Sequence, residues 1–306
     1  MIKNIKPKQL NIMIKKQLLF ILAVTTFGFV NTAQSQSPIS GFMQEKGKGN
    51  ISLSFSSEKY NEVYFIPEKV DGVPVFNETQ VTSKSIYATY GISNQVEVVF
   101  VLPYITARGN ATQEVLTNLN LENERKGIQD VSVFVKYSPF NFDFGSSSLR
   151  LIGALGLKTP LGNYKVEEGF QSIIAIGNRS TTLSTTGMAM FRMNSGAFAS
   201  AQLAANYASN DVPNSYATEL KIGYAARLFY GDAFIANQTS TGGVDIFGEG
   251  FAGYFPTTKV NYTKVGLNLY TPIYKDFGVS AGASTLIAGR NIGKSTGFYG
   301  GLVYKF

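Results

Sequence analysis

Apolar residues recur at every second position in one segment after another from about residue 49 onward. They alternate with serine in 51–55, with glutamate, lysine and glycine in 219–224, and with lysine, glycine and asparagine in 264–269. Successive side chains of a β-strand point to opposite faces of its sheet. Each segment therefore predicts a strand with one apolar face and one mixed polar face.

We expect twelve such strands, several of them close to the roughly 9–11 residues that a tilted strand needs to cross a bilayer. No stretch after residue 36 approaches the apolar length of a membrane-spanning helix, which is about 20 residues. The predicted strands span 49–59, 81–91, 95–105, 127–138, 148–158, 181–193, 197–207, 216–228, 232–240, 261–273, 277–288 and 296–306.

The connections between these strands sort by length. Short turns are predicted at Gly91–Asn94 and Pro139–Ser147, whereas Tyr60–Gln80, Ala107–Lys126 and Thr241–Val260 are long loops. Short turns at one end and long loops at the other are typical of outer-membrane barrels, with the turns on the periplasmic side. An even number of strands then places both termini of the barrel segment at the periplasmic side.

A closed, antiparallel, all-β transmembrane barrel satisfies this pattern because backbone groups in a bilayer must pair internally, and closure removes the sheet edges. The apolar positions of each strand, which we call its apolar parity, then face lipid. The alternate positions, its polar parity, face the lumen. A Lys or Arg on the lipid face at mid-depth costs roughly 2–4 kcal/mol. The charged residues on the polar parity are Glu97, Asp130, Lys136, Arg150, Lys158, Arg192, Glu219, Lys221, Lys264 and Lys305.

Two interpretations of these inward charges stay open. They form either a contact surface for a solute or a salt-bridged network that fills the lumen. Seven of the ten are basic, which predicts a modest preference for anions in a conducting pore. The candidates for solute contact are Glu97, Asp130, Lys136, Arg150, Arg192, Lys221 and Lys264.

The first residues have the layout of a secretory signal peptide. Five lysines without an acid precede the apolar run Leu18–Val30, and the small and polar stretch Asn31–Gln36 follows. We predict cleavage after Ser35, with Met13 as an alternative start of translation. A buried N-terminal helix is the alternative, but it leaves the charge pattern unexplained.

The chain thus divides into a removed signal peptide (1–35), a periplasmic N-terminal stretch (36–48) and the barrel (49–306). Twelve strands leave some space in the lumen, and we expect either loops or the stretch 36–48 to plug it. Loss of the five signal lysines lowers the formal net charge from +7 to +2. The basicity is therefore no argument for a nucleic-acid partner.

Catalytic chemistry has few residues to work with. The chain contains no Cys and no His, which excludes thiol nucleophiles, Cys-ligated zinc and Ser-His triads. Glu122 and Glu124 form a conceivable glycosidase pair, although charges in a solvated loop are the simpler interpretation. We predict no enzyme, no catalytic residues, no cofactor and no metal.

The last twelve residues, STGFYGGLVYKF, resemble the closing strand of outer-membrane barrels. Such proteins commonly end in Phe, with apolar or aromatic residues two, four and eight positions earlier. Here these positions hold Phe306, Tyr304, Leu302 and Phe298. The resemblance implies that this end is the signal read by the barrel-assembly machinery.

Three further segments resemble the barrel family named for the meta-pathway of phenol degradation, often called "transporter". Gly127–Tyr137 is similar to its G-x-x-D-x-x-x-x-x-K-Y strand, Gly156–Gly162 to its G-x-K-x-P-x-G strand exit, and Gly289–Asn291 to its last hairpin. The resemblance covers the chain from about the fourth strand to the end. It implies uptake of small hydrophobic or aromatic compounds.

We therefore expect a channel or transporter for small solutes in the outer membrane of a Gram-negative bacterium. Its expected partners are outer-membrane lipid, lipopolysaccharide, the assembly machinery and the solute. The alternative is a non-transporting barrel that binds surfaces or partners, or acts structurally, through long loops such as Ala107–Lys126.

Overall fold

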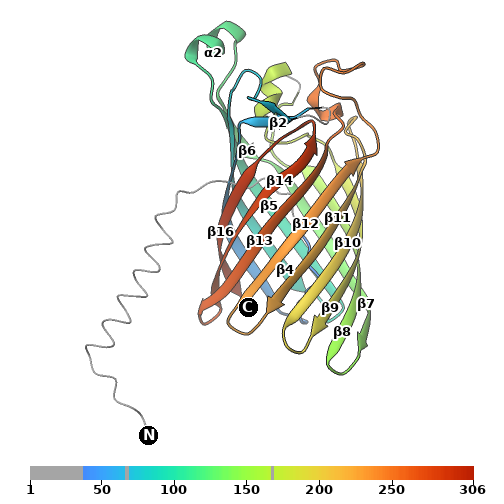
Figure 1. The fold of residues 1–306 in the computed structure, drawn as a ribbon. Helices are drawn as coiled ribbons and strands as arrows, with labels where there is room; N and C mark the ends of the chain where they lie inside the picture. The colour runs from blue at the N-terminus through green and yellow to red at the C-terminus, as the bar shows by residue number, and fades with distance from the viewer. Residues whose placement is uncertain (1–36, 66–68, 167–168) are drawn as a thin grey trace, which may run out of the picture.

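Twelve antiparallel strands close into a tilted barrel in the computed structural model, which describes residues 37–65, 69–166 and 169–306 (Figure 1). The residues of the predicted signal peptide lie outside this described part. The strands of the barrel are β1 (Gly49–Tyr60), β4 (Thr79–Gly91), β5 (Val96–Gly109), β7 (Asp130–Asp143), β8 (Ser147–Pro160), β9 (Thr182–Met193), β10 (Ala197–Ala208), β11 (Ser215–Ala225), β12 (Tyr230–Ser240), β13 (Asn261–Tyr274), β14 (Phe277–Arg290) and β16 (Thr296–Lys305).

Each strand pairs with its neighbours in the chain, and β1 pairs with β16 to complete the circle. All twelve predicted strands are confirmed, with ends that shift by a few residues. The remaining strands are β2 (Glu62–Tyr64), β3 (Lys69–Asp71), β6 (Glu124–Ile128) and β15 (Ile292–Gly293). The helices within the described residues are α2 (Gln113–Leu119) and the 3₁₀ turns η1 (Gly169–Ile174) and η2 (Phe255–Thr257).

The two faces of the wall follow the period of two. Side chains of the apolar parity, such as Leu53, Leu203 and Leu267, are more than half exposed on the outside. Side chains of the polar parity, such as Lys136 and Glu219, are buried inside the barrel. None of the helices among the described residues is long and apolar enough to span a bilayer.

The turn predicted at Pro139–Ser147 is wrong in its position. Strand β7 continues through Pro139 to Asp143, and its pairing with β8 shifts register between Tyr137 and Phe140. Proline donates no hydrogen bond to a ladder, so it fits at such an irregularity without ending the strand. The turn itself lies at residues 144–146, where Gly145 has φ of 80°.

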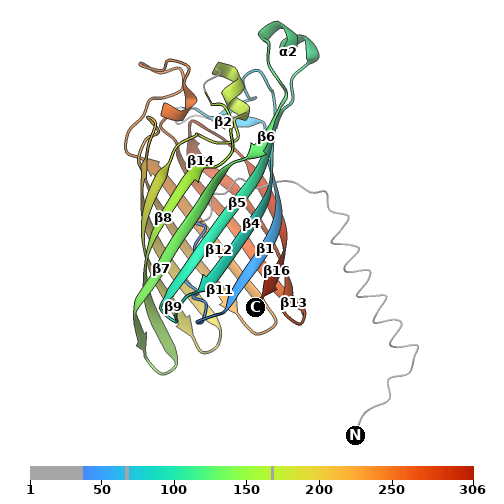
Figure 2. The same ribbon diagram turned by 180° about the vertical axis from the view of Figure 1, so that it is seen from behind.

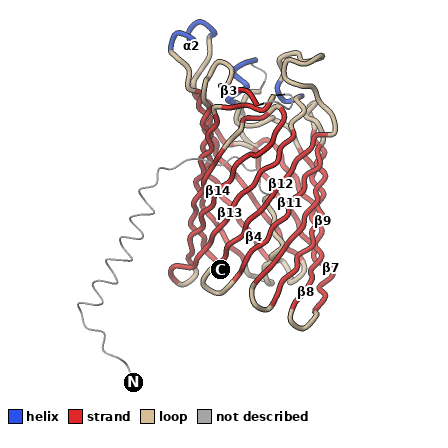
Figure 3. The backbone as a smooth tube through the Cα atoms, viewed as in Figure 1, coloured by secondary structure: helices blue, strands red, loops and turns tan. Residues whose placement is uncertain are grey.

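The two ends of the barrel differ as predicted. Short turns join strands at one end, which we call the periplasmic end, and the helices of the described residues all lie at the other, extracellular end (Figure 3). The barrel starts and finishes at the periplasmic end, where Gly49 and Phe306 exchange backbone hydrogen bonds of 2.9 and 3.0 Å. The first and the last barrel strand thus have their termini at the same end, as an even strand count predicts.

The extracellular loops form a cap with its own apolar core. Strands β15, β2 and β3 make a small second sheet across this end. Phe76 is fully buried and clusters with Leu116 of α2, Tyr164 and Ile174 of η1. Residues from three different loops therefore hold one another in place above the lumen.

Candidate functional site: the lumen and its N-terminal segment

Six of the ten predicted inward charges are buried inside the barrel, and most of the ten are paired. Glu97 of β5 lies directly opposite Lys136 of β7 in the ladder, with 2.7 Å between carboxylate oxygen and Nζ. Both side chains are almost completely buried. Three further lysines approach carboxylates: Lys158 to Asp130 at 3.9 Å, Lys221 to Glu219 at 3.2 Å and Lys264 to Glu58 at 3.5 Å.

Two inward acids were missed by the sequence analysis. Glu58 follows the serine parity of β1 and is buried, and Asp232 near the start of β12 is buried between Tyr230 and Asn268. The alternation of β1 is a signal that finds Glu58. Adding both changes the predicted ratio of seven basic to three acidic residues to seven to five, which weakens the argument for anion preference.

A segment outside the barrel wall occupies the lumen. Residues 37–45, the start of the described chain, run inside the periplasmic half of the barrel (Figure 2). The Ser37 backbone N–H donates to Glu219 of β11 over 3.2 Å, and the Gln202 side-chain amide of β10 donates to the Ser37 hydroxyl over 2.6 Å. We call residues 37–48 the lumen segment. The sequence analysis assigned the stretch 36–48 to the periplasm and also named it, beside the loops, as a candidate plug of the lumen; residues 37–45 lie inside the barrel.

The Glu97–Lys136 pair holds the part of the lumen segment that lies nearest the periplasmic end. Lys136 Nζ donates to the carbonyl oxygen of Phe42 over 2.7 Å, and the Gln44 backbone N–H donates to the Glu97 carboxylate over 2.6 Å. Charge-assisted hydrogen bonds of this kind are about twice as strong as neutral ones. The pair therefore does more than cancel its own charge, because it latches a separate piece of chain.

Apolar contacts add to these polar ones. Ile39 is buried against inward side chains of β5, β7, β8 and β9, among them Val99, Phe134 and Met188. Gly41 lies so close to Met190 that an added Cβ would meet the Met190 sulfur at 2.8 Å. The wall and the lumen segment thus fit each other as a packed surface.

A tight turn connects the lumen segment to the wall. The Lys48 N–H donates to the Glu45 carbonyl over 3.0 Å, and Gly47 has φ of 76°, a conformation that glycine adopts without strain. Gly49 then starts β1 at the rim. The chain therefore reverses direction at the periplasmic end, and this turn joins the segment covalently to the first strand of the wall.

The lumen segment does not fill the lumen. A cavity of about 320 Å³ remains beside it, bounded by Ser37, Ser40 and the inward face of the opposite wall. The strands of that wall contribute hydroxyls at Ser52, Ser54, Ser56, Ser85, Ser280 and Ser284. Part of the lumen is thus closed by chain and part is a polar space.

Three predicted inward cations have no carboxylate within ion-pair distance among the described residues: Arg150, Arg192 and Lys305. All three lie at the periplasmic end. The Lys305 ammonium lies over the Tyr270 ring at 4.4 Å, and the Arg192 guanidinium lies over the Phe42 ring at 5.2 Å. Arg150 and Arg192 border one cavity of about 420 Å³.

The extracellular end has a different cavity, of about 220 Å³. It lies between the cap and the loops that follow β12 and β14, and most of its lining is apolar or aromatic. Phe65, Phe170, Phe247 and Phe255 contribute rings to this lining. A small apolar molecule fits such a surface better than an ion does.

Polar contacts tie the loop that borders this cavity to the barrel. Arg290 donates two hydrogen bonds to Asp245, of 2.7 and 2.6 Å, and Asn291 adds a third of 2.8 Å. The Arg290 guanidinium and the Asn291 amide hold the pKa of Asp245 at about 2, below its usual value. The loop is therefore fixed by a charged anchor at physiological pH.

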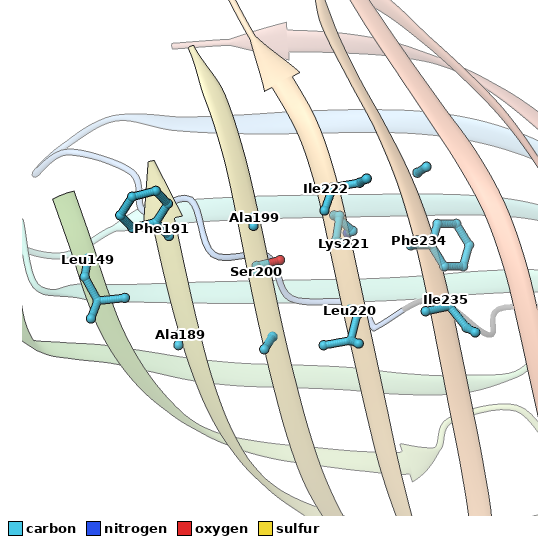
Figure 4. A pocket seen from close by; sticks show the side chains of 12 residues that line it. Leu149, Ala189, Phe191, Ala199, Ser200, Leu220, Lys221, Ile222, Phe234 and Ile235 are labelled. Atoms are coloured by element: carbon cyan, nitrogen blue, oxygen red, sulfur yellow. The ribbon is translucent and has the colours of Figure 1, made fainter. Parts of the chain in front are cut away.

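A groove on the outer face belongs to the lipid contact. Its volume is about 550 Å³, and it lies where Ala189, Ala199 and Ala233 leave room between larger side chains (Figure 4). Leu149 and Ile222 border it on the outward parity. A closed barrel presents such a surface to acyl chains, so the groove is no part of the solute site.

The residues of the predicted assembly signal share the outer face. Phe298, Leu302 and Tyr304 are exposed outward on β16, and the Phe306 ring stacks with Tyr304 and Tyr90 at the rim. Their recognition by an assembly machinery stays a prediction.

Comparison with known proteins supports the fold. The structure of the COG4313 outer membrane channel from Pseudomonas putida F1 matches with a TM-score of 0.66 at 12% identity, covering 90% of this chain and 100% of that one. The KdgM porin matches with a TM-score of 0.44 at 8% identity, covering 83% and 99%. No family model and no curated protein matches the chain.

The fold and the apolar outer face together define an outer-membrane β-barrel, and the protein belongs in the outer membrane. The particular likeness is to the COG4313 channel, and it is a likeness of fold. The resemblance to the meta-pathway phenol-degradation family stays a prediction.

Proposed function

We propose that the protein is an outer-membrane channel for small solutes, hydrophobic and aromatic ones among them, and that the lumen segment is its movable plug. The observation that carries the proposal is the position of residues 37–45 inside the barrel. A lumen that holds residues 37–45 is wide enough to pass a small solute once that segment leaves.

The manner of attachment supports movement. No backbone ladder joins residues 37–45 to the barrel strands, so withdrawal breaks side-chain contacts and leaves the wall intact. The apolar cavity under the cap supports a hydrophobic or aromatic solute class, because its four phenylalanines offer little to an ion.

Single-channel recording in planar bilayers tests the proposal, together with liposome uptake of arabinose and phenylalanine. We expect rare openings of the full-length mature protein and persistent conductance, with uptake of both probes, after deletion of residues 37–45. If the deletion variant folds but neither conducts nor admits either probe, the channel function is wrong.

A second function is favoured by α2. This helix tops a hairpin that projects beyond the rest of the cap, and Leu119 at its end is half exposed (Figure 1). A projecting apolar tip suits binding to a surface or a partner. Removal of residues 111–122 should abolish binding by whole cells if this is the function, and should leave conductance unchanged.

A further inference from the structure

The Phe42 side chain of the lumen segment lies in a site built from rings of the wall. Its ring meets Phe198 of β10 edge-on at 5.2 Å and Tyr230 of β12 edge-on at 5.8 Å. Phe198 and Tyr230 stack with each other at 5.5 Å. Edge-to-face contacts at these distances are favourable beyond simple burial. The wall therefore offers a receptor for one benzene ring.

The wall keeps space for this receptor. Strand β11 lies between β10 and β12, and Gly223 is its residue at this level. A Cβ at Gly223 would meet the Phe198 ring at 2.6 Å. The absence of a side chain lets Phe198 lie across β11 toward Tyr230. Tyr230 is fixed in turn by its hydrogen bond of 2.6 Å to Asp232.

Two guanidinium groups adjoin the ring receptor. Arg192 of β9 is the ladder partner of Phe198, and its guanidinium lies 5.2 Å from the Phe42 ring centroid. Arg150 of β8 pairs with Met190, which makes it the diagonal neighbour of Arg192 on the same inward face. Diagonal neighbours in a ladder are about 7–8 Å apart, so the two positive charges repel each other.

No carboxylate of the described residues neutralises this pair. Among the acids nearby, Glu97 is engaged by Lys136 and Gln44, and Asp232 accepts from Tyr230 and Asn268. Glu45 of the lumen segment borders the same cavity without reaching ion-pair distance. The amides of Asn94 and Asn141 complete a polar lining. Arg150 is partly buried and Arg192 is exposed toward the periplasmic end, and an anion between the two like charges relieves their repulsion.

We propose that this part of the lumen binds small aromatic carboxylates, and that Phe42 occupies the ring receptor in their absence. The ring of such a solute replaces the Phe42 ring between Phe198 and Tyr230. Its carboxylate joins Arg150 and Arg192, which bind oxyanions in a bidentate manner. The inference rests on the proposed function, since the solute is one that the channel passes.

Competition between solute and Phe42 gives the site a role in opening. A solute that takes the ring receptor removes one of the contacts that hold the lumen segment. By linkage, whatever weakens the Phe42 contact strengthens binding of the solute by the same factor. The latch between Phe42 O and Lys136 remains, so the binding step is separable from full withdrawal.

Fluorine NMR titration of the purified mature protein with 4-fluorobenzoate tests the site. Phe42→Ala should bind the probe at least tenfold more tightly than the wild type, because the receptor is vacated. Arg150→Gln combined with Arg192→Gln in the Phe42→Ala background should weaken binding at least tenfold, since each lost charged hydrogen bond costs about that factor. Lys305→Gln in the same background is the matched control and should change nothing.

Competitors separate the two halves of the site. Benzoate should displace the probe, while cyclohexanecarboxylate, benzyl alcohol and inorganic phosphate should each displace it at least tenfold less well. Equal displacement by phosphate would show a general oxyanion site, and equal displacement by benzyl alcohol a general apolar one; either result overturns the proposal. So does equal binding to wild type and Phe42→Ala, provided that both keep the heat-modifiable mobility of a folded barrel.

The proposed function and this inference fail separately. Binding of the probe without conductance by the variant that lacks residues 37–45 contradicts the channel and keeps the site. Conductance without specific binding of the probe keeps the channel and contradicts the site.

Discussion

The two ends of the barrel are closed in different ways. At the extracellular end, several loops share an apolar core around Phe76, and each loop is tied to two strands. At the periplasmic end, the lumen segment is tied to one strand and held by the Glu97–Lys136 pair and the Phe42 ring.

The difference indicates that the periplasmic end moves more easily than the extracellular end. Opening the cap exposes buried apolar surface and pulls on chain that is fixed on both sides. Withdrawing a segment that is held mainly by side-chain contacts exposes less apolar surface, chiefly at Ile39 and the Phe42 ring, and exchanges a small number of polar contacts for water. We therefore expect solute entry to be controlled at the periplasmic end, with the cap as a fixed frame.

The largest effect should follow from breaking the latch. Lys136→Met leaves Glu97 buried and uncompensated, which typically costs about 3–5 kcal/mol. The chain has no native cysteine, so a single Met43→Cys reports on the segment. Its labelling by a water-soluble thiol reagent should accelerate strongly with Lys136→Met.

Adding Glu97→Gln to Lys136→Met should restore part of the protection of Met43→Cys, because the buried charge is then gone. Unchanged labelling in both variants would mean that the pair is not what holds the segment.

A comparable effect is expected at the extracellular end, where the cap should loosen and the lumen segment should stay in place. Phe76→Ala removes a fully buried ring from the cap, and such changes cost about 3–5 kcal/mol. Hydrogen exchange of residues 161–166 should rise. Labelling of Met43→Cys should stay at the wild-type rate, and an increase there would show that the two ends are coupled.

A smaller effect should come from overpacking the segment. Gly41→Leu forces a side chain against Met190, and overpacking of this kind typically costs about 1–3 kcal/mol. Channel openings should become more frequent in bilayer recordings. Met190→Ala in the same protein restores the room and should return the frequency toward that of the wild type.

The rim of the barrel offers a test of assembly that leaves the lumen unchanged. Phe306→Ser removes the ring that stacks with Tyr304 and Tyr90. We expect less folded, heat-modifiable protein in the outer membrane, and normal conductance of the molecules that do fold. Normal amounts of folded protein would show that this residue is an ordinary strand end.

The smallest effect concerns pH at the cap. Hydrogen bonds from Arg290 hold the pKa of Asp245 at about 2, compared with 3.8 for a free carboxyl group. The stabilisation from a lowered pKa is fully present above the unfolded value and disappears as the pH falls through the folded one. The protection factors of residues 244–259, in which the intrinsic pH dependence of amide exchange is divided out, should therefore stay constant from pH 7 to pH 4.

Below pH 4, the protection factors of the same segment should fall toward pH 2. Asp245→Asn is the control and should remove this pH dependence, since no carboxyl group remains to be protonated. A fall in protection that already starts at pH 5 would contradict the assignment to Asp245.

The contrast between the two ends was only partly visible in the sequence. The inward position of Lys136 and Glu97 was predicted from parity, and the option that 36–48 plugs the lumen was left open beside the loops. The pairing of these two residues with Phe42 and Gln44 was not predictable. Nothing in the pattern of a short polar stretch distinguishes a place in the periplasm from one inside the barrel.

The sequence by itself determined the wall of this protein. Lipid outside, lumen inside and a closed backbone ladder impose a period of two on every strand, so each strand carries its own orientation locally. Tertiary structure alone decided what occupies the lumen. Lys136 meets Glu97 across 39 positions, and Ser37 meets Glu219 across 182. Such contacts depend on where closure brings distant strands together, which no local pattern of residues records.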